Sequence, residues 1–394
     1  MYSFDHNLFY LSGFFLAGSV AFFYYPLAGL LFLIFSFVLA FDRILWFHPC
    51  DIIFVPFFIS GLLRIAFKKI KPFAGRKIVF YFFPFFAALI ISAALGPEPF
   101  KFKGQIYLWL QIPFTYIIAL NLIKTFKQLK FIIYSMIASG FILAVLYICI
   151  QYPFNFFLDQ PYSLGHNLMA TVFGFCLFLI LGSLTGQKKK NHRNILFISV
   201  AIVFVSMILT TSRWGIATFL FSVFIFINFA LKKDRLKINS FMFSLLCGSL
   251  LLFVPLYFFY PDFFDRFQLK FYNLWFRMEI FHSALLFIRQ HPLKGIGLGY
   301  FFSYTYLNHA HNIFLQIMVE AGLIGLVSFV FFILAAARYF IQKIRKFPEF
   351  DRPIFYAVSG CFLFFLLQNM LDFTLDRGIG IQIGLLLAIM DLST

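Results

Sequence analysis

Charged side chains are scarce in this chain of 394 residues, of which only 12% are Asp, Glu, Lys or Arg. Soluble globular proteins carry about 25% charged residues, so a water-soluble protein is excluded. Hydrophobic residues make up 62% of the chain, and 66 residues are phenylalanine. Apolar runs of roughly 20 residues recur along nearly the whole length, as membrane-spanning helices require, and the alternation typical of a membrane β-barrel is absent. The sequence therefore predicts an all-α polytopic membrane protein.

Cysteine pairs and nucleotide-binding motifs are also lacking. The five cysteines lie within or at the edges of apolar segments and have no paired spacing. This pattern indicates neither a disulfide framework nor a thiolate metal site. No Walker loop, dinucleotide-type glycine pattern or HExxH motif occurs. ATP-driven transport within this chain is therefore disfavoured.

Hydropathy predicts twelve or thirteen spanning helices that form a single transmembrane domain over residues 1–394. The number is twelve or thirteen because Tyr25-Pro26 divides the first apolar stretch into two short segments, and because the last segment is short for a full span. The expected spans are 8–25, 26–41, 44–66, 78–95, 105–123, 131–150, 165–186, 195–211, 213–231, 238–260, 311–337, 354–372 and 378–391.

The net charge of +17 comes from basic residues that gather in alternate loops, at 68–77, 124–130, 188–193, 232–237 and 338–352. Lys and Arg are enriched in the cytoplasmic loops of membrane proteins, so these loops are predicted to be cytoplasmic. Topology then explains the excess of positive charge, and no nucleic-acid partner is expected. By the same alternation residues 261–310 form one large external loop, which is periplasmic in a two-membrane bacterium.

The external loop carries apolar residues at helical spacing. The spacing predicts an amphipathic helix that lies along the membrane surface or packs across the mouth of the bundle. Cations occur in this loop although the topology usually leaves that side poor in them. Most are interpreted as anchors that reach lipid phosphates, whereas for Arg277 an anionic substrate is favoured. The apolar positions are Phe271, Leu274, Trp275, Met278, Phe281, Leu285 and Ile288.

Arg213 lies at the expected external end of two spanning helices. A guanidinium at that depth is costly unless it is paired or faces a watery cavity, which makes Arg213 a candidate for a functional site. Ser212 is expected to cap the helix that begins there, and the positive end of that helix would reinforce an anion site. A simple interfacial anchor is the alternative for Arg213.

A polar segment between His291 and Glu320 interrupts the apolar sequence. Its glycines, from Gly295 to Gly299, suit a tight turn whose backbone can approach a ligand, although an ordinary re-entrant turn would look the same. His309 and His311 stand just before an apolar helix, where a neutral imidazole is suited to accept a proton from a hydroxyl group. A metal site formed by these two histidines ranks lower because no acidic or thiol ligand is near them in sequence.

Three polar residues are supporting candidates around this pair, namely Lys294, Asn312 and Glu320. Glu320 would lie roughly 13 Å below the start of its helix and needs a partner there. Gly322 and Gly325 are interpreted as positions of close helix packing. Tyr300, Tyr304 and Tyr306 are candidates for sugar platforms, with interfacial tyrosine as the alternative.

Several motifs, taken in order, resemble the O-antigen ligase and Wzy-type O-antigen polymerase superfamily of bacterial inner membranes. The resemblance extends over about 165–337 and starts with Asn167 at a helix start. The remaining motifs are Ser212-Arg213 opening a helix, Arg277, His291-Pro-Leu-Lys-Gly-Ile-Gly, His311-Asn312-Ile-Phe-Leu-Gln316 and Glu320-Ala-Gly322-Leu-Ile-Gly325.

The resemblance implies a GT-C-like glycosyltransferase in the bacterial inner (cytoplasmic) membrane with its active site facing the periplasm. It implies an undecaprenyl-pyrophosphate-linked glycan as donor and no metal, nucleotide or other cofactor. Arg213 and Arg277 match arginines that bind the donor pyrophosphate, and His311 matches the histidine proposed as general base. The implied acceptor is the hydroxyl group of a lipid A core or of a growing glycan, so ligase and polymerase are not separated.

A transporter or flippase for lipid-linked sugars is the alternative class. Such a protein would need charged residues along a path through the helix bundle. Helix-embedded charges are few, with Arg64 and Glu320 as the main candidates. This scarcity favours the enzyme.

Overall fold

A computed structural model of the chain describes residues 14–39, 49–71, 77–99, 101, 103–154, 166–186, 189–230, 271–305, 309–345, 352–375 and 378–392. Their regular secondary structure is helical, with no strand among them, which confirms the expected class. Six of their helices are long and apolar enough to cross a membrane. Every expected span has a helical counterpart except 238–260, which lies outside the described residues together with 261–270.

The described residues group into two compact units, and the first comprises those within 1–80, 108–143 and 375–394. Tyr25 is not helical and Pro26 opens the next helix, so the expected division of the first apolar stretch is confirmed. Arg64 donates a hydrogen bond of 2.6 Å to the carbonyl oxygen of Phe23. Helices lying wholly or partly in this unit are Phe14–Tyr24, α2 (Pro26–Phe35), η1 (Ser36–Leu39), α3 (Pro49–Ala66), α4 (Lys77–Leu95), α5 (Lys103–Leu122), α6 (Phe126–Phe154) and α16 (Ile379–Asp391).

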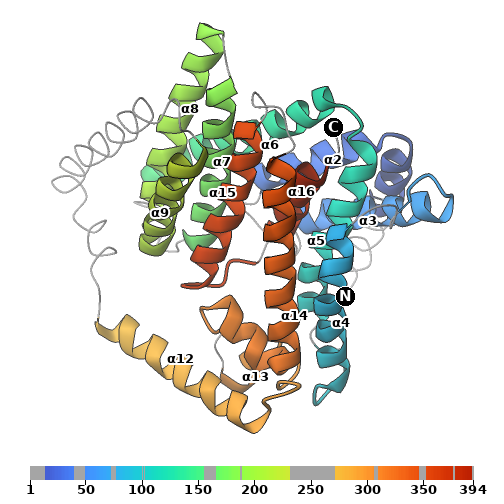
Figure 1. The fold of residues 1–394 in the computed structure, drawn as a ribbon, viewed down its shortest axis with the longest axis vertical. Helices are drawn as coiled ribbons and strands as arrows, with labels where there is room; N and C mark the ends of the chain where they lie inside the picture. The colour runs from blue at the N-terminus through green and yellow to red at the C-terminus, as the bar shows by residue number, and fades with distance from the viewer. Residues whose placement is uncertain are drawn as a thin grey trace. The chain divides into compact units, whose positions relative to one another are not determined.

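The second unit comprises described residues within 81–107 and 144–374 and is built around α7. In the apolar stretch of α7, 89% of the residues are buried, because α7 lies among its neighbours α8, α9 and α15 (Figure 1). Glycine permits this close packing, since a Cβ on Gly174 would lie 2.1 Å from the ring of Phe364. Besides parts of α4, α5 and α6, its helices are α7 (His166–Gly186), α8 (Lys190–Leu209), α9 (Arg213–Ala230), α12 (Phe271–Gln290), α13 (Tyr300–Thr305), α14 (Ile313–Ile344) and α15 (Arg352–Asn369).

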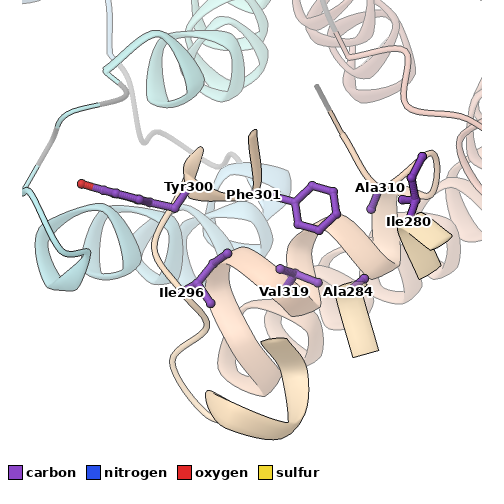
Figure 2. Close-up of a cluster of buried hydrophobic side chains, with 7 residues drawn as sticks. All are labelled: Ile280, Ala284, Ile296, Tyr300, Phe301, Ala310 and Val319. Carbon is purple, nitrogen blue, oxygen red and sulfur yellow. The ribbon is translucent and has the colours of Figure 1, made fainter. Parts of the chain in front are cut away.

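The expected external loop contributes α12 and α13, which pack against α14. Figure 2 shows the buried cluster that joins them, which includes Ile280 and Ala284 of α12 and Val319 of α14. Part of the expected apolar stripe, Ile288, packs against the cluster, whereas other residues of the stripe are exposed. Trp275 is 67% exposed and Met278 61% exposed, so α12 buries one apolar face in the protein and leaves a second one uncovered.

The glycine segment is paired with a break in α14, which agrees with a re-entrant turn, one of its two interpretations. Gly322 has φ 65°, and the backbone N–H groups of Ile296 and Gly297 donate to the carbonyls of Val319 and Glu320 just before it. A Cβ on Gly322 would lie 2.2 Å from the carbonyl oxygen of Leu293. Gly322 therefore lets a loop enter the broken helix, whereas helix packing was expected.

Candidate functional site

Asp372 follows α15 and is the centre of the main polar cluster among the described residues. Nδ1 of His311 lies 2.7 Å from Oδ1 of Asp372, and Nε2 of His309 lies 3.5 Å from the same oxygen. The Asp372 side chain is 4% exposed, whereas each histidine is 26% exposed. Burial by itself raises the pKa of Asp372, but hydrogen bonds from His309 and His311 outweigh it and hold that pKa well below the ordinary value. Asp372 is therefore a buried, ionised acceptor for both rings.

The other oxygen of Asp372 is held by α7. The side-chain amide of Asn167 donates to Oδ2 of Asp372, and the Asn167 amide oxygen accepts a 2.5 Å hydrogen bond from the Ser212 hydroxyl group. The Ser212 oxygen also accepts from the backbone N–H of Gly215 at 3.1 Å. The expected helix cap is thus confirmed. Because Ser212 fixes which end of the Asn167 amide faces Asp372, the carboxylate has one defined orientation.

The segment 370–374 is tied to the rest of the second unit by three further side chains. Arg277 donates to the carbonyl oxygen of Leu371 at 2.8 Å, and Asn312 donates to that of Met370 at 2.8 Å. Asn369 pairs with Thr374 through both its amide oxygen and its amide nitrogen. Arg277 and Asn312, separated in sequence, therefore converge on the backbone that carries Asp372.

Arg213 is the residue after Ser212 and the first of α9, so the same network places it at the edge of the cluster. Two nearby non-glycine residues have left-handed backbones, with φ 56° at Thr211 and φ 50° at His311. Such conformations cost on the order of 1–3 kcal/mol each and persist where the surrounding contacts enforce them. Strain at Thr211 and His311 marks the cluster as a constrained site.

Lys294 and Glu320, two of the expected supporting residues, differ in exposure. Lys294 is exposed in the turn before the glycine segment. The Glu320 side chain is 4% exposed and accepts hydrogen bonds from the backbone of Gly299 and Phe301 and from Gln316. These contacts make Glu320 an anchor for the start of α13.

The three tyrosines considered as sugar platforms do not share one environment. Tyr300 is 4% exposed, and its hydroxyl group bonds the backbone N–H and carbonyl of Glu98 at 2.6 and 2.9 Å. Figure 2 shows that hydroxyl pointing away from the buried cluster. A sugar platform at Tyr300 is therefore wrong, whereas Tyr304 is 49% exposed. Tyr306 lies outside the described residues.

The cluster also has the composition of a metal site. The candidate donor atoms of His309, His311 and Asp372 lie within 4.8 Å of one another. Two imidazole nitrogens and a carboxylate oxygen suit Zn²⁺. No acidic ligand is near the histidines in sequence, but the fold brings Asp372 to them from 61 residues after His311.

Asp372 was missed by reading the sequence, although a signal for it exists. It lies at the end of the expected span 354–372, after Gln368 and Asn369. An ionisable residue at the end of an apolar span is itself a functional candidate. Its partner, however, is not deducible from its position.

Comparison with known proteins gives one family match. Residues 198–330 match the family model described as O-Antigen ligase. No curated protein matches the chain. The second unit is thus part of a multi-pass membrane enzyme of the ligase/polymerase type. The chain carries an O-antigen ligase family domain, as the resemblance implied, and that family implies transfer of lipid-linked glycans and suggests the inner membrane.

The matched region includes Arg213, Arg277 and His311 but neither Asn167 nor Asp372. The polar cluster therefore extends beyond the matched region on both sides. Asn167 enters it from α7, and Asp372 enters it from the segment after α15.

Proposed function

We propose that the protein transfers a glycan from an undecaprenyl-pyrophosphate carrier to an acceptor hydroxyl group, with inversion and without a metal, at the periplasmic face of the bacterial inner membrane. The observation that carries this proposal is the 2.7 Å contact between Nδ1 of His311 and the buried carboxylate of Asp372. The contact supports His311 as a general base within the region that matches the O-antigen ligase family model.

His311 is the proposed base because Asp372 selects its tautomer. An ionised carboxylate only accepts hydrogen bonds, so Nδ1 of His311 donates and the lone pair of the neutral ring resides on Nε2. Nε2 takes the proton of the acceptor hydroxyl group as its oxygen bonds to the anomeric carbon. Asp372 stabilises the imidazolium that results.

Arg213 and Arg277 are proposed to bind the donor pyrophosphate. When the bond between the anomeric carbon and the phosphate oxygen breaks, negative charge develops on the leaving pyrophosphate. Guanidinium groups bind such oxygens in a bidentate manner. The bond from Arg277 to Leu371 uses one of several N–H donors. The N-terminus of α9, where Arg213 lies, adds a positive helix end.

The surroundings of Arg64 and Glu320 support an enzyme over a transporter or flippase. Arg64 is bonded to the backbone of Phe23, and Glu320 is bonded to the backbone at Gly299 and Phe301. Both charges therefore anchor neighbouring segments. The acceptor is proposed to be the hydroxyl group of a lipid A core or of a growing glycan.

Purified protein in detergent, supplied with a lipid-pyrophosphate glycan and an acceptor, tests the proposal. Product formed without a sealed membrane would exclude pure transport. His311→Ala, Arg213→Ala and Arg277→Ala are expected to abolish transfer while the protein still folds. His282→Ala, which removes an exposed histidine of α12, is the matched control and should retain activity. Full transfer by His311→Ala would refute the mechanism.

A further inference from the structure

A cavity of about 510 Å³ lies between α9, α14 and α15. It is bordered by the last residues of α14, whereas His311 precedes the first residue of that helix. Its size is within the range of about 300–1,000 Å³ that is typical of small-molecule sites. Most of its lining is apolar and includes Ile225, Phe226, Ile341 and Leu363, whereas the polar groups come from Arg345, Tyr356, Ser222 and Ser359.

Arg345 and Tyr356 belong to the adjoining ends of α14 and α15. Arg352, the first residue of α15, donates to the carbonyl oxygen of Arg345 at 3.4 Å, so the start of α15 adjoins the end of α14. Tyr356 lies in the first part of α15, and Leu363 follows roughly 10 Å further along at about 1.5 Å per residue. A cationic opening that leads to an apolar interior is suited to an amphiphile with an anionic head.

The surface of α14 leads to this opening. Exposed apolar side chains run along one side of the helix, from Leu323 and Val327 through Phe331 and Leu334 to Ile341, which is 55% exposed. Arg338 and Arg345 are exposed near Ile341 and lie seven residues apart, on one helix face. An apolar stripe that ends in arginines is typical of the boundary between lipid chains and headgroups.

The sequence around the opening is basic. Five basic residues and two acidic residues occur between positions 338 and 352. Basic pockets between spanning helices on the cytoplasmic side are known to bind anionic lipid headgroups. The expected topology places this end of α14 on that side.

We propose that this cavity binds an anionic glycerophospholipid of the surrounding leaflet. The phosphate contacts Arg345 and the hydroxyl group of Tyr356, and an acyl chain occupies the apolar interior between α9 and α15. The donor lipid is disfavoured as the occupant of this cavity, because the length of α14 separates the cavity from the proposed pyrophosphate site. Helix α14 is broken at Gly322, and the 22 residues from Leu323 to Ile344 rise about 33 Å at 1.5 Å per residue, more than the hydrocarbon core of about 30 Å. The proposed pyrophosphate site and Arg345 would therefore face opposite leaflets.

Native mass spectrometry of the purified protein in a neutral detergent tests the site through titration with phosphatidylglycerol or with phosphatidylcholine of the same acyl chains. Phosphatidylglycerol should bind more tightly. Arg345→Gln should weaken its binding about fivefold, as expected for loss of one arginine near an anionic lipid. Arg338→Gln removes the same charge from the same face outside the cavity lining, and it should change binding less than twofold.

A second pair of variants tests the cavity independently of charge. Ser359 lines the cavity, so Ser359→Phe fills it and should abolish the preference for phosphatidylglycerol. Ser328→Phe places the same bulk on α14 outside the cavity lining and should leave the preference for phosphatidylglycerol unchanged.

Equal losses of binding in Arg338→Gln and Arg345→Gln would show a general surface effect and overturn the proposal. Wild-type binding by Ser359→Phe, or displacement of phosphatidylglycerol by polyprenyl phosphate, would also overturn it. Because the readout is binding, the result is independent of the proposed glycan transfer.

Discussion

His311 and Asp372 form a hydrogen-bonded pair, with Nδ1 of the ring 2.7 Å from the carboxylate, although 61 residues separate them. The pair joins the start of α14 to the segment that follows α15. Asn167, from α7, holds the second oxygen of the same carboxylate. The general base proposed for glycan transfer is therefore oriented by residues of three separate parts of the second unit.

The first prediction concerns the charge of Asp372. Asp372→Asn keeps the size of the side chain but offers His311 an amide that can donate, which removes the preference for a proton on Nδ1. We expect kcat for glycan transfer to fall about 10³-fold or more, as for a misoriented catalytic histidine. Steady-state kinetics with the lipid-linked donor would measure it. Glu98→Gln, the same exchange at an exposed carboxylate, is the control. A loss below tenfold in Asp372→Asn would contradict the assigned role.

The second prediction concerns Asn167 as a positioning residue. Asn167→Asp places a second carboxylate against Asp372, and two carboxylates that share a site raise the pKa of one of them. The retained proton weakens Asp372 as an acceptor until the pH rises above that pKa. The acid limb of the pH–rate profile should therefore move upward by about one unit or more.

Asn167→Ala separates positioning from a general structural effect. It removes the donor without adding a charge, so it should lower kcat at every pH and leave the acid limb in place. If both variants gave parallel profiles at reduced activity, Asn167 would be a packing residue only.

The third prediction concerns stability and pH. Hydrogen bonds from the two histidines lower the pKa of Asp372 below its unfolded value of about 3.9. A depressed folded pKa contributes stability that is present above the unfolded value and is lost as the pH falls toward the folded one. The difference in unfolding free energy between wild type and Asp372→Asn should therefore not shrink between about pH 8 and pH 5.

Below about pH 4 the same difference should decrease, because the unfolded chain then takes up the proton more readily than the folded protein. Chemical unfolding in detergent at a series of pH values would measure it. A difference that disappears by about pH 6 would mean that Asp372 is not held ionised by the histidines.

The fourth prediction concerns the break in α14. Gly322→Ala should destabilise the protein by on the order of 3 kcal/mol, because φ is 65° and the new Cβ would lie 2.2 Å from the carbonyl oxygen of Leu293. Thermal unfolding followed by circular dichroism would measure the loss. Gly104→Ala is the control, since a Cβ there meets no atom within 4 Å and should be neutral or mildly stabilising. Equal effects in the two variants would show that the loop does not pair with α14 at Gly322.

Reading the sequence was most successful where the information is local. The helix cap at Ser212 and the division before Pro26 each depend on a few adjacent residues, and both are confirmed. The interpretation of Gly322 failed for the opposite reason. A helical glycine beside another helix and a glycine at a helix break look alike in sequence, and the paired loop is more than twenty residues away.

The sequence by itself determined the class of the protein, its apolar helices and the basic loops, because hydropathy and charge act within a span and need no knowledge of neighbours. It also identified Arg213, Arg277 and His311 as the residues to examine. Only the tertiary structure decided which residues meet them. Asp372, Asn167 and Ser212 form one network because close packing of α7, α9 and α15 brings distant segments together. A buried carboxylate persists only where donors surround it, and those donors are supplied by the fold.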